Sequence, residues 1–93
     1  MSKARAHLII SGRVQGVFYR AFTEEAARSL GIKGWVRNLP DGGVEALFEG
    51  EKDDIEKAVG ICRKGPPASV VRDVDVNWED FRAEFDAFSI RYF

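Results

Sequence analysis

Apolar and polar residues alternate at the start of the chain, between Arg5 and Gly12. The apolar positions on one side of this segment are Ala6, Leu8 and Ile10. A period of two is typical of a strand with one buried face, because successive side chains of an extended chain point to opposite sides. The pattern therefore predicts a first strand here, with these three residues in the core.

A spacing of four residues follows further along the chain, where Phe22, Ala26 and Leu30 recur. Residues four apart lie on the same face of a helix. We therefore expect a helix from about Ala21 to Leu30 with these residues on its apolar face. Gly31 is a natural stop for it, because glycine adopts the left-handed conformation that often ends a helix.

Two apolar segments, residues 32–38 and 44–49, lie on either side of a turn. The turn has the sequence Leu39-Pro40-Asp41-Gly42-Gly43. Proline presets one backbone angle and Asp-Gly favours a reversal of the chain, so the two segments are predicted to pair as a β-hairpin.

A second helix is indicated between Asp53 and Gly65. Asp53 and Glu56 have the spacing of a capping box, which satisfies backbone N–H groups at the start of a helix. Gly65 and the two prolines after it mark the C-terminal end. The apolar face that would pack on a sheet consists of Ile55, Ala58, Val59 and Cys62.

Two further strands are predicted near the C-terminus, over residues 70–78 and 88–93. In the second of them, Phe88, Ile90 and Tyr92 face one way. Both segments show the period of two that is typical of strands. The chain therefore has a strand after each helix and one more at its end.

This order of elements predicts an α+β fold, a ferredoxin-like βαββαβ sandwich with two helices on one face of a four- to five-stranded antiparallel sheet. We expect residues 1–93 to form a single domain. Trp35, Trp78 and the phenylalanines would fill its core. The fold alone says little about function, because it serves many functions.

The composition narrows the functional classes. A formal net charge of −1 gives no reason to expect nucleic acid or a membrane as a partner. Cys62 is the single cysteine, so no disulfide can form within the chain, and we expect a cytoplasmic protein. Asp73 and Asp75 alternate on a strand without further ligands, so no metal site is expected. A monomer is the default for so small a domain.

The segment from Gly12 to Arg20 joins the first strand to the first helix. It contains two glycines and two arginines, Arg13 and Arg20. Backbone N–H groups in such a loop can converge on one anion, and the helix N-terminus adds the positive end of its dipole. Arg20 offers a permanently charged, planar guanidinium group that fits a phosphate. We therefore expect a phosphate site here, with Arg13 as a solvated or steering charge.

Two signatures carry a resemblance to a known family. Gly12-Arg13-Val14-Gln15-Gly16-Val17-Phe18-Tyr19-Arg20 resembles the N-terminal signature of the acylphosphatases. Gly34-Trp35-Val36-Arg37-Asn38, followed by Asp41-Gly42-Gly43-Val44-Glu45, resembles their second signature. The similarity covers nearly the whole chain, including its order of elements and the Phe-x-Ile-Arg-Tyr sequence near its end.

The resemblance implies an acylphosphatase, which hydrolyses the carboxyl–phosphate bond of a small-molecule acyl phosphate without metal or cofactor. It implies that Arg20 binds the phosphate and that Asn38 holds the attacking water. Some members of the family have a hydroxyl residue after this asparagine; Leu39 stands there in this chain, and we expect an effect on rate but not on reaction type. The backbone amides expected to complete the phosphate site belong to Gln15, Gly16, Val17, Phe18, Tyr19 and Arg20.

Two other interpretations remain open. The chain could be a non-catalytic ferredoxin-like ligand-binding or regulatory module, for which exposed aromatic residues or a basic face would be needed. It could also be a free-standing relative of the acylphosphatase-like domain in carbamoyl-phosphate-processing maturation enzymes. The sequence shows no obvious pocket for the acyl group of a substrate.

Overall fold

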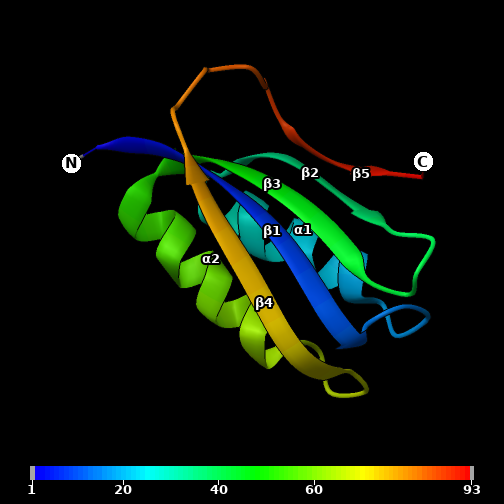
Figure 1. The fold of residues 1–93 in the computed structure, drawn as a ribbon. Helices are drawn as coiled ribbons and strands as arrows, with labels where there is room; N and C mark the ends of the chain where they lie inside the picture. The colour runs from blue at the N-terminus through cyan, green and yellow to red at the C-terminus, as the bar shows by residue number, and fades with distance from the viewer. Residues whose placement is uncertain (1, 93) are drawn as a thin grey trace.

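The computed structural model describes residues 2–92. Within that range the chain forms two helices and five strands (Figure 1). In chain order these elements are β1 (Lys3–Arg13), α1 (Tyr19–Ser29), β2 (Lys33–Asn38), β3 (Val44–Glu51), α2 (Lys52–Lys64), β4 (Val70–Glu79) and β5 (Phe88–Arg91). Every predicted element is present; the last residue of the predicted final strand, Phe93, lies outside the described residues.

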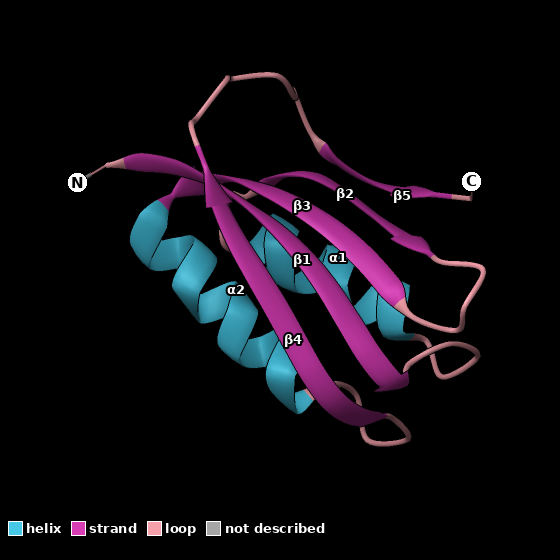
Figure 2. Cartoon of the chain, viewed as in Figure 1, coloured by secondary structure: helices cyan, strands magenta, loops and turns pink. Residues whose placement is uncertain are grey.

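The strands form one sheet in the order β4-β1-β3-β2-β5, and both helices cover the same face of it (Figure 2). This is the predicted α+β, ferredoxin-like arrangement. One pairing differs from the prediction, because β5 runs parallel to β2 and the sheet is therefore mixed. The reason is the direction of each strand. Strands β1 and β2 are both antiparallel to β3, so they run the same way, and β4 is antiparallel to β1. Strand β5 runs in the direction opposite to β4 and is therefore parallel to β2.

The predicted core positions of β1 and α2 are confirmed. Ala6, Leu8 and Ile10 are fully buried, and the apolar face of α2 packs on the sheet. Cys62 belongs to that face, and burial raises the pKa of its thiol to about 11. A buried thiol of this kind acts as a small apolar side chain in the core.

The buried face of α1 lies one position beyond the predicted one. Its fully buried residues are Tyr19, Thr23 and Ala27, while the predicted Phe22, Ala26 and Leu30 are half-buried. Two polar side chains can occupy this interface because both are hydrogen-bonded. The Tyr19 hydroxyl donates to the carbonyl of Cys62 at 2.7 Å, and the Thr23 hydroxyl donates to the carbonyl of Tyr19 at 2.9 Å.

The predicted capping box of the second helix is wrong. Strand β3 runs directly into α2, so Glu51 occupies the N-cap position, and its side chain makes no cap hydrogen bond. The N–H group of Lys52 donates instead to the carbonyl of Ser2 at 2.9 Å. Asp53 falls inside the first turn, where a negative charge is favourable because the helix dipole is positive at that end.

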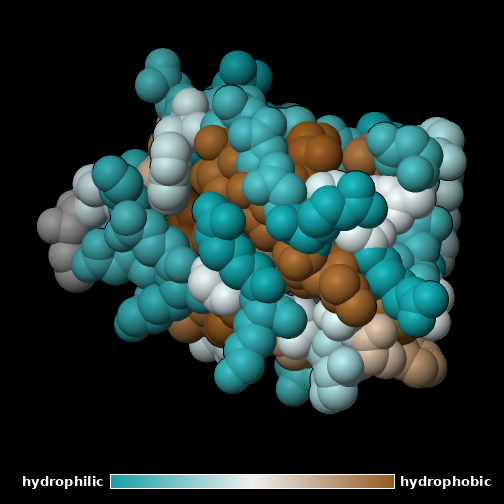
Figure 3. All heavy atoms as spheres, turned by 60° about the horizontal axis from the view of Figure 1, so that its bottom comes forward, coloured by the Kyte–Doolittle hydropathy of each residue, from teal (hydrophilic) through white to brown (hydrophobic). Residues whose placement is uncertain are grey.

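Not all the aromatic residues fill the core as expected. Phe48 and Phe88 are buried, but Trp78 is 44% exposed on the edge strand β4, and Trp35 is only half-buried. Phe18 is 85% exposed. On the face turned forward in Figure 3, apolar atoms form patches separated by hydrophilic side chains. An edge strand has only one neighbouring strand to cover it, which leaves Trp78 in contact with solvent and with Lys52.

Candidate active site

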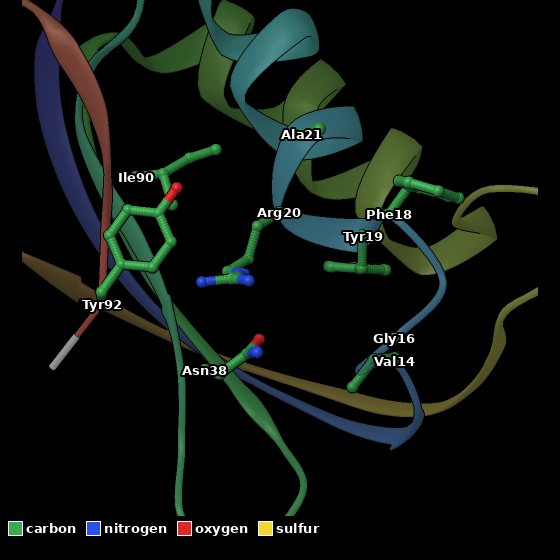
Figure 4. A pocket seen from close by; sticks show the side chains of 9 residues that line it. All are labelled: Val14, Gly16, Phe18, Tyr19, Arg20, Ala21, Asn38, Ile90 and Tyr92. Carbon is green, nitrogen blue, oxygen red and sulfur yellow. The ribbon is translucent and has the colours of Figure 1, made fainter.

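The loop between β1 and α1 borders a cavity of about 320 Å³ at the end of the sheet where the β2–β3 turn also lies. Three parts of the chain line it: the loop with the first turn of α1, Asn38 at the end of β2, and Ile90 and Tyr92 from the C-terminal segment (Figure 4). Residues distant in sequence therefore meet around one cavity.

The backbone of the loop has the geometry of an anion site. Gly16 and Phe18 have left-handed conformations, with φ of 74° and 63°, and Phe18 is the N-cap of α1. Within residues 2–92, no backbone N–H group from Gln15 to Arg20 donates a hydrogen bond to another residue. The first turn of α1 contains no acidic residue. Unpaired N–H groups at a helix N-terminus favour binding of an anion.

Arg20 extends from the first turn of α1 into the cavity, and its guanidinium group lies between Tyr92 and Asn38 in Figure 4. Its Cζ atom is 4.9 Å from the centre of the Tyr92 ring. No carboxylate among the described residues forms an ion pair with it. Among residues 2–92, no carboxylate therefore competes with a phosphate for the guanidinium donors.

Asn38 is the last residue of β2 and points into the same cavity. Its Oδ1 atom is buried and has no hydrogen-bond partner among residues 2–92. Buried polar atoms of native proteins almost always have a partner, so an unpaired one in a cavity indicates a ligand or water contact. The amide oxygen can accept a hydrogen bond from a water molecule.

The side chain of Gln15 connects the two halves of the site. Its Nε2 atom donates to the carbonyls of Leu39 and Gly43, both at 2.7 Å. These carbonyls belong to the turn that directly follows Asn38, so Gln15 fixes the loop relative to the asparagine. Sequence reasoning assigned only the backbone amide of Gln15, because the position of the turn relative to the loop depends on strand pairing.

The remaining predicted residues divide between the site and the core. The Tyr19 side chain points into the core, where burial raises its pKa above the ordinary value and keeps the hydroxyl a donor. Val17 is half-buried and Arg13 is exposed, and neither lines the cavity. Tyr19 and Val17 can therefore serve the site through their backbone amides, and Arg13 through its charge.

Sequence reasoning missed Ile90 and Tyr92 as cavity residues. The parallel pairing of β5 with β2 sets Arg91 beside Arg37, so the next residue, Tyr92, falls beside Asn38. The signal that could have found Tyr92 is the length of the C-terminal strand, but only if its parallel register with β2 were known.

His7 lies outside the cavity, on the face of the sheet away from the helices. It is half-buried, not freely exposed as a lone histidine on an open strand would be, and it contacts Glu45, which also pairs with Arg37. Burial acts to raise the pKa of Glu45, but the hydrogen bonds from His7 and Arg37 outweigh this effect and leave the pKa lowered. This cluster is a hydrogen-bonded network on the sheet surface that contains the Arg37–Glu45 ion pair.

Among residues 2–92, no three His, Cys, Asp or Glu side chains come together as a metal site would require. Neither described helix has the length and hydrophobicity to cross a membrane.

The chain is similar to known proteins along nearly its whole length. A family model described as acylphosphatase matches residues 6–90. The acylphosphatase of Syntrophobacter fumaroxidans is 60% identical over 92 residues, which cover 99% of this chain and 95% of that protein. That of Pelotomaculum thermopropionicum is 49% identical over 92 residues, covering 99% and 100%. The crystal structure of the Bacillus subtilis acylphosphatase matches with a TM-score of 0.93 and 36% identity, covering 96% of this chain and 99% of that one.

Proposed function

This chain belongs to the acylphosphatase family, and from that premise we propose how its residues hydrolyse an acyl phosphate. The protein is an acylphosphatase, an enzyme of the hydrolase class that acts on small-molecule acyl phosphates. It releases a carboxylate and inorganic phosphate. The observation that carries the proposed mechanism is the shared cavity, in which the guanidinium group of Arg20 and the unpaired Oδ1 atom of Asn38 lie together.

In this mechanism the phosphate of the substrate binds to Arg20 and to the backbone amides of the loop. The amides belong to Gln15, Gly16, Val17, Phe18, Tyr19 and Arg20 itself. Hydrogen bonds to a charged group contribute about 1.5–3 kcal/mol each. The same donors follow the charge on the equatorial phosphoryl oxygens into the transition state, where preorganised donors are most effective.

Asn38 holds the attacking water through its Oδ1 atom. A carboxamide accepts a hydrogen bond but cannot take up a proton, so it orients the water and does not act as a base. The water oxygen forms a bond to phosphorus as the bond from phosphorus to the acyl oxygen breaks, and the carboxylate leaves with the electron pair. The water proton passes to a phosphate oxygen or to solvent. No general acid is needed, because a carboxylate has little affinity for a proton.

We also propose that residues 1–93 form one domain that works as a monomer in the cytoplasm and binds no nucleic acid. The formal net charge of −1 and the single, buried Cys62 support this proposal. The comparisons favour the enzyme over a non-catalytic binding module, since the curated relatives over the full chain are acylphosphatases. Turnover of carbamoyl phosphate against benzoyl phosphate would separate an ordinary acylphosphatase from a relative of the maturation enzymes.

The two assigned roles are tested by comparing Asn38→Ala with Arg20→Ala on benzoyl phosphate. Asn38→Ala should lower kcat by about 10²–10³-fold while inorganic phosphate still inhibits with nearly the unaltered constant. Arg20→Ala should lower kcat by about 10³-fold or more and also weaken inhibition by phosphate at least about tenfold.

Arg13→Ala is the matched control, because Arg13 is an exposed arginine next to the same loop but outside the cavity. Its kcat should stay within about twofold of the unaltered enzyme. Phosphate inhibition that survives Arg20→Ala, or is lost in Asn38→Ala, would contradict the division of roles.

A further inference from the structure

Two exposed aromatic side chains stand at the proposed phosphate site. Phe18 and Tyr92, which are 85% and 75% exposed, are the most exposed large hydrophobic residues among residues 2–92. Both line the same cavity. Large apolar side chains that remain exposed beside a binding cavity are candidates for contact with a ligand, because burying them against it is favourable.

The two rings are differently placed. In Figure 4 the Tyr92 ring lies against the guanidinium group of Arg20, whereas the Phe18 side chain points away from it. The distance from the Arg20 Cζ atom to the centre of the Tyr92 ring is 4.9 Å. Ile90, half-buried beside Tyr92, continues the apolar surface on that side of the cavity.

The geometry of a guanidinium group determines what lies next to the Tyr92 ring. Its N–H donors point outward in the plane of the group, so a phosphate bound to Arg20 sits at its edge. The Tyr92 ring lies beside this group, with its centre 4.9 Å from the Arg20 Cζ atom, and Tyr92 remains largely exposed. An acyl group attached to that phosphate therefore starts within reach of the Tyr92 ring.

We propose that Tyr92 is a specificity-determining residue whose ring contacts the acyl group of the substrate. This contact favours acyl phosphates with a planar, apolar acyl group, such as benzoyl phosphate, over acetyl phosphate. The inference rests on the proposed phosphate site. Aromatic pairs in offset or edge-to-face contact are stabilising beyond the area that they bury, which gives the preference its physical basis.

A role in orienting Arg20 alone would have a different signature. Arg20 acts on the phosphate, which all acyl phosphates share, so misplacing it lowers the rates of both substrates by the same factor. Contact with the acyl group changes the ratio of the two rates. The ratio of kcat/KM for benzoyl phosphate to kcat/KM for acetyl phosphate is therefore the decisive quantity.

The experiment measures this ratio in the unaltered enzyme and in Tyr92→Ala, Tyr92→Phe and Phe18→Ala. Tyr92→Ala should lower the ratio about fivefold, Tyr92→Phe should keep it within about twofold because the ring remains, and Phe18→Ala should also keep it within about twofold. An unchanged ratio in Tyr92→Ala, or an equal fall in Phe18→Ala, overturns the proposal. If the unaltered enzyme hydrolyses neither substrate, the proposed function fails instead.

A second measurement does not depend on turnover. Phosphonates in which a methylene group replaces the bridging oxygen of benzoyl and acetyl phosphate compete for the same site but cannot be hydrolysed by this route. Tyr92→Ala should weaken inhibition by the phenyl compound about fivefold relative to the methyl compound. An equal loss for both inhibitors assigns Tyr92 to Arg20 alone and overturns the proposal.

Discussion

Two loops at opposite ends of β1 share a backbone conformation but differ in what their N–H groups bind. The loop between β1 and α1 contains Phe18, and the crossover between β4 and β5, residues 80–87, contains Ala83. These are the only non-glycine residues with positive φ within residues 2–92, at 63° and 52°. Each loop lies beside an arginine that comes from a regular element, Arg20 in one case and Arg5 in the other.

In the crossover the anion is supplied by the protein. The N–H groups of Arg82 and Glu84, on either side of Ala83, donate to the carboxylate of Glu49 at 2.8 and 2.9 Å. The Nη1 atom of Arg5 is 3.2 Å from the same carboxylate. Successive N–H groups around a left-handed residue form a concave anion site, often called a nest. The same backbone arrangement thus stabilises the fold where the carboxylate of Glu49 occupies it. In the loop between β1 and α1, where no carboxylate among residues 2–92 occupies it, the N–H groups are available to a substrate.

The crossover, residues 80–87, is called the filled loop below because it binds the carboxylate of Glu49. The largest expected effect comes from removing that carboxylate. Glu49→Ala leaves two N–H groups unpaired and removes the most buried partner of Arg5. Removing one member of a buried ion pair typically costs 3–5 kcal/mol. We expect a loss of about 3 kcal/mol in the free energy of unfolding, because Arg5 keeps its more exposed partners Glu79 and Glu84. Urea denaturation measures it.

The loop between β1 and α1 is called the open loop below. Arg20→Met, in the first turn of the helix that follows it, is the matched change there. No carboxylate among residues 2–92 depends on Arg20, so the free energy of unfolding should change by less than about 0.5 kcal/mol while activity is lost. Equal destabilisation by Glu49→Ala and Arg20→Met would mean that the two loops do not differ in the way described.

A smaller effect is expected from protonating Glu49 instead of removing it. Burial works to raise its pKa, but the hydrogen bonds from the N–H groups of Arg82 and Glu84 and from Arg5 leave the pKa lowered. A carboxyl group with a lower pKa in the folded state stabilises the fold above its unfolded pKa of about 4.3. This stabilisation is lost as the pH falls from there through the folded pKa.

The free energy of unfolding should therefore decrease as the medium is acidified below about pH 5. Glu49→Gln should make this decrease shallower without abolishing it, because the lowered pKa of Glu45 acts in the same direction. The open loop should behave differently: the proposed mechanism contains no general acid or base, so kcat should stay nearly flat from mildly acidic to mildly alkaline pH. A bell-shaped profile centred near pH 7 would indicate a titrating catalytic group and contradict the mechanism.

The difference between the loops also shows what the sequence could predict. Gly12, Gly16 and Arg20 fall within one short stretch of the chain, so an anion site could be recognised from residues 12–20 alone. The filled loop depends on Arg5, Glu49 and the crossover, which are separated by 44 and 33 positions in the chain. No local pattern brings them together. The strand register does so, because Arg5 faces Glu49 across β1 and β3.

The same distinction holds within the elements and the site. The apolar faces of β1 and α2 follow from local periodicity, whereas the face of α1 was misplaced because Tyr19 and Thr23 are buried through long-range or backbone hydrogen bonds that hydropathy does not register. Arg20 was predicted from its loop. Its proximity to Asn38 was implied only by the family resemblance, and that of Tyr92 follows from the parallel pairing of β5.

The smallest effect that we predict concerns the left-handed residues themselves. A residue with a Cβ atom pays about 1–2 kcal/mol for this conformation, and glycine avoids the cost but gains freedom in the unfolded chain. Ala83→Gly should therefore raise the free energy of unfolding by about 0.5 kcal/mol, with no change in inhibition by inorganic phosphate. Phe18→Gly should give a similar small change in stability, measured by urea denaturation. It should also weaken phosphate inhibition about two- to fivefold, because the open loop has no internal carboxylate to hold its N–H groups in place. If Phe18→Gly leaves phosphate inhibition unchanged, the rigidity of the open loop does not contribute to binding.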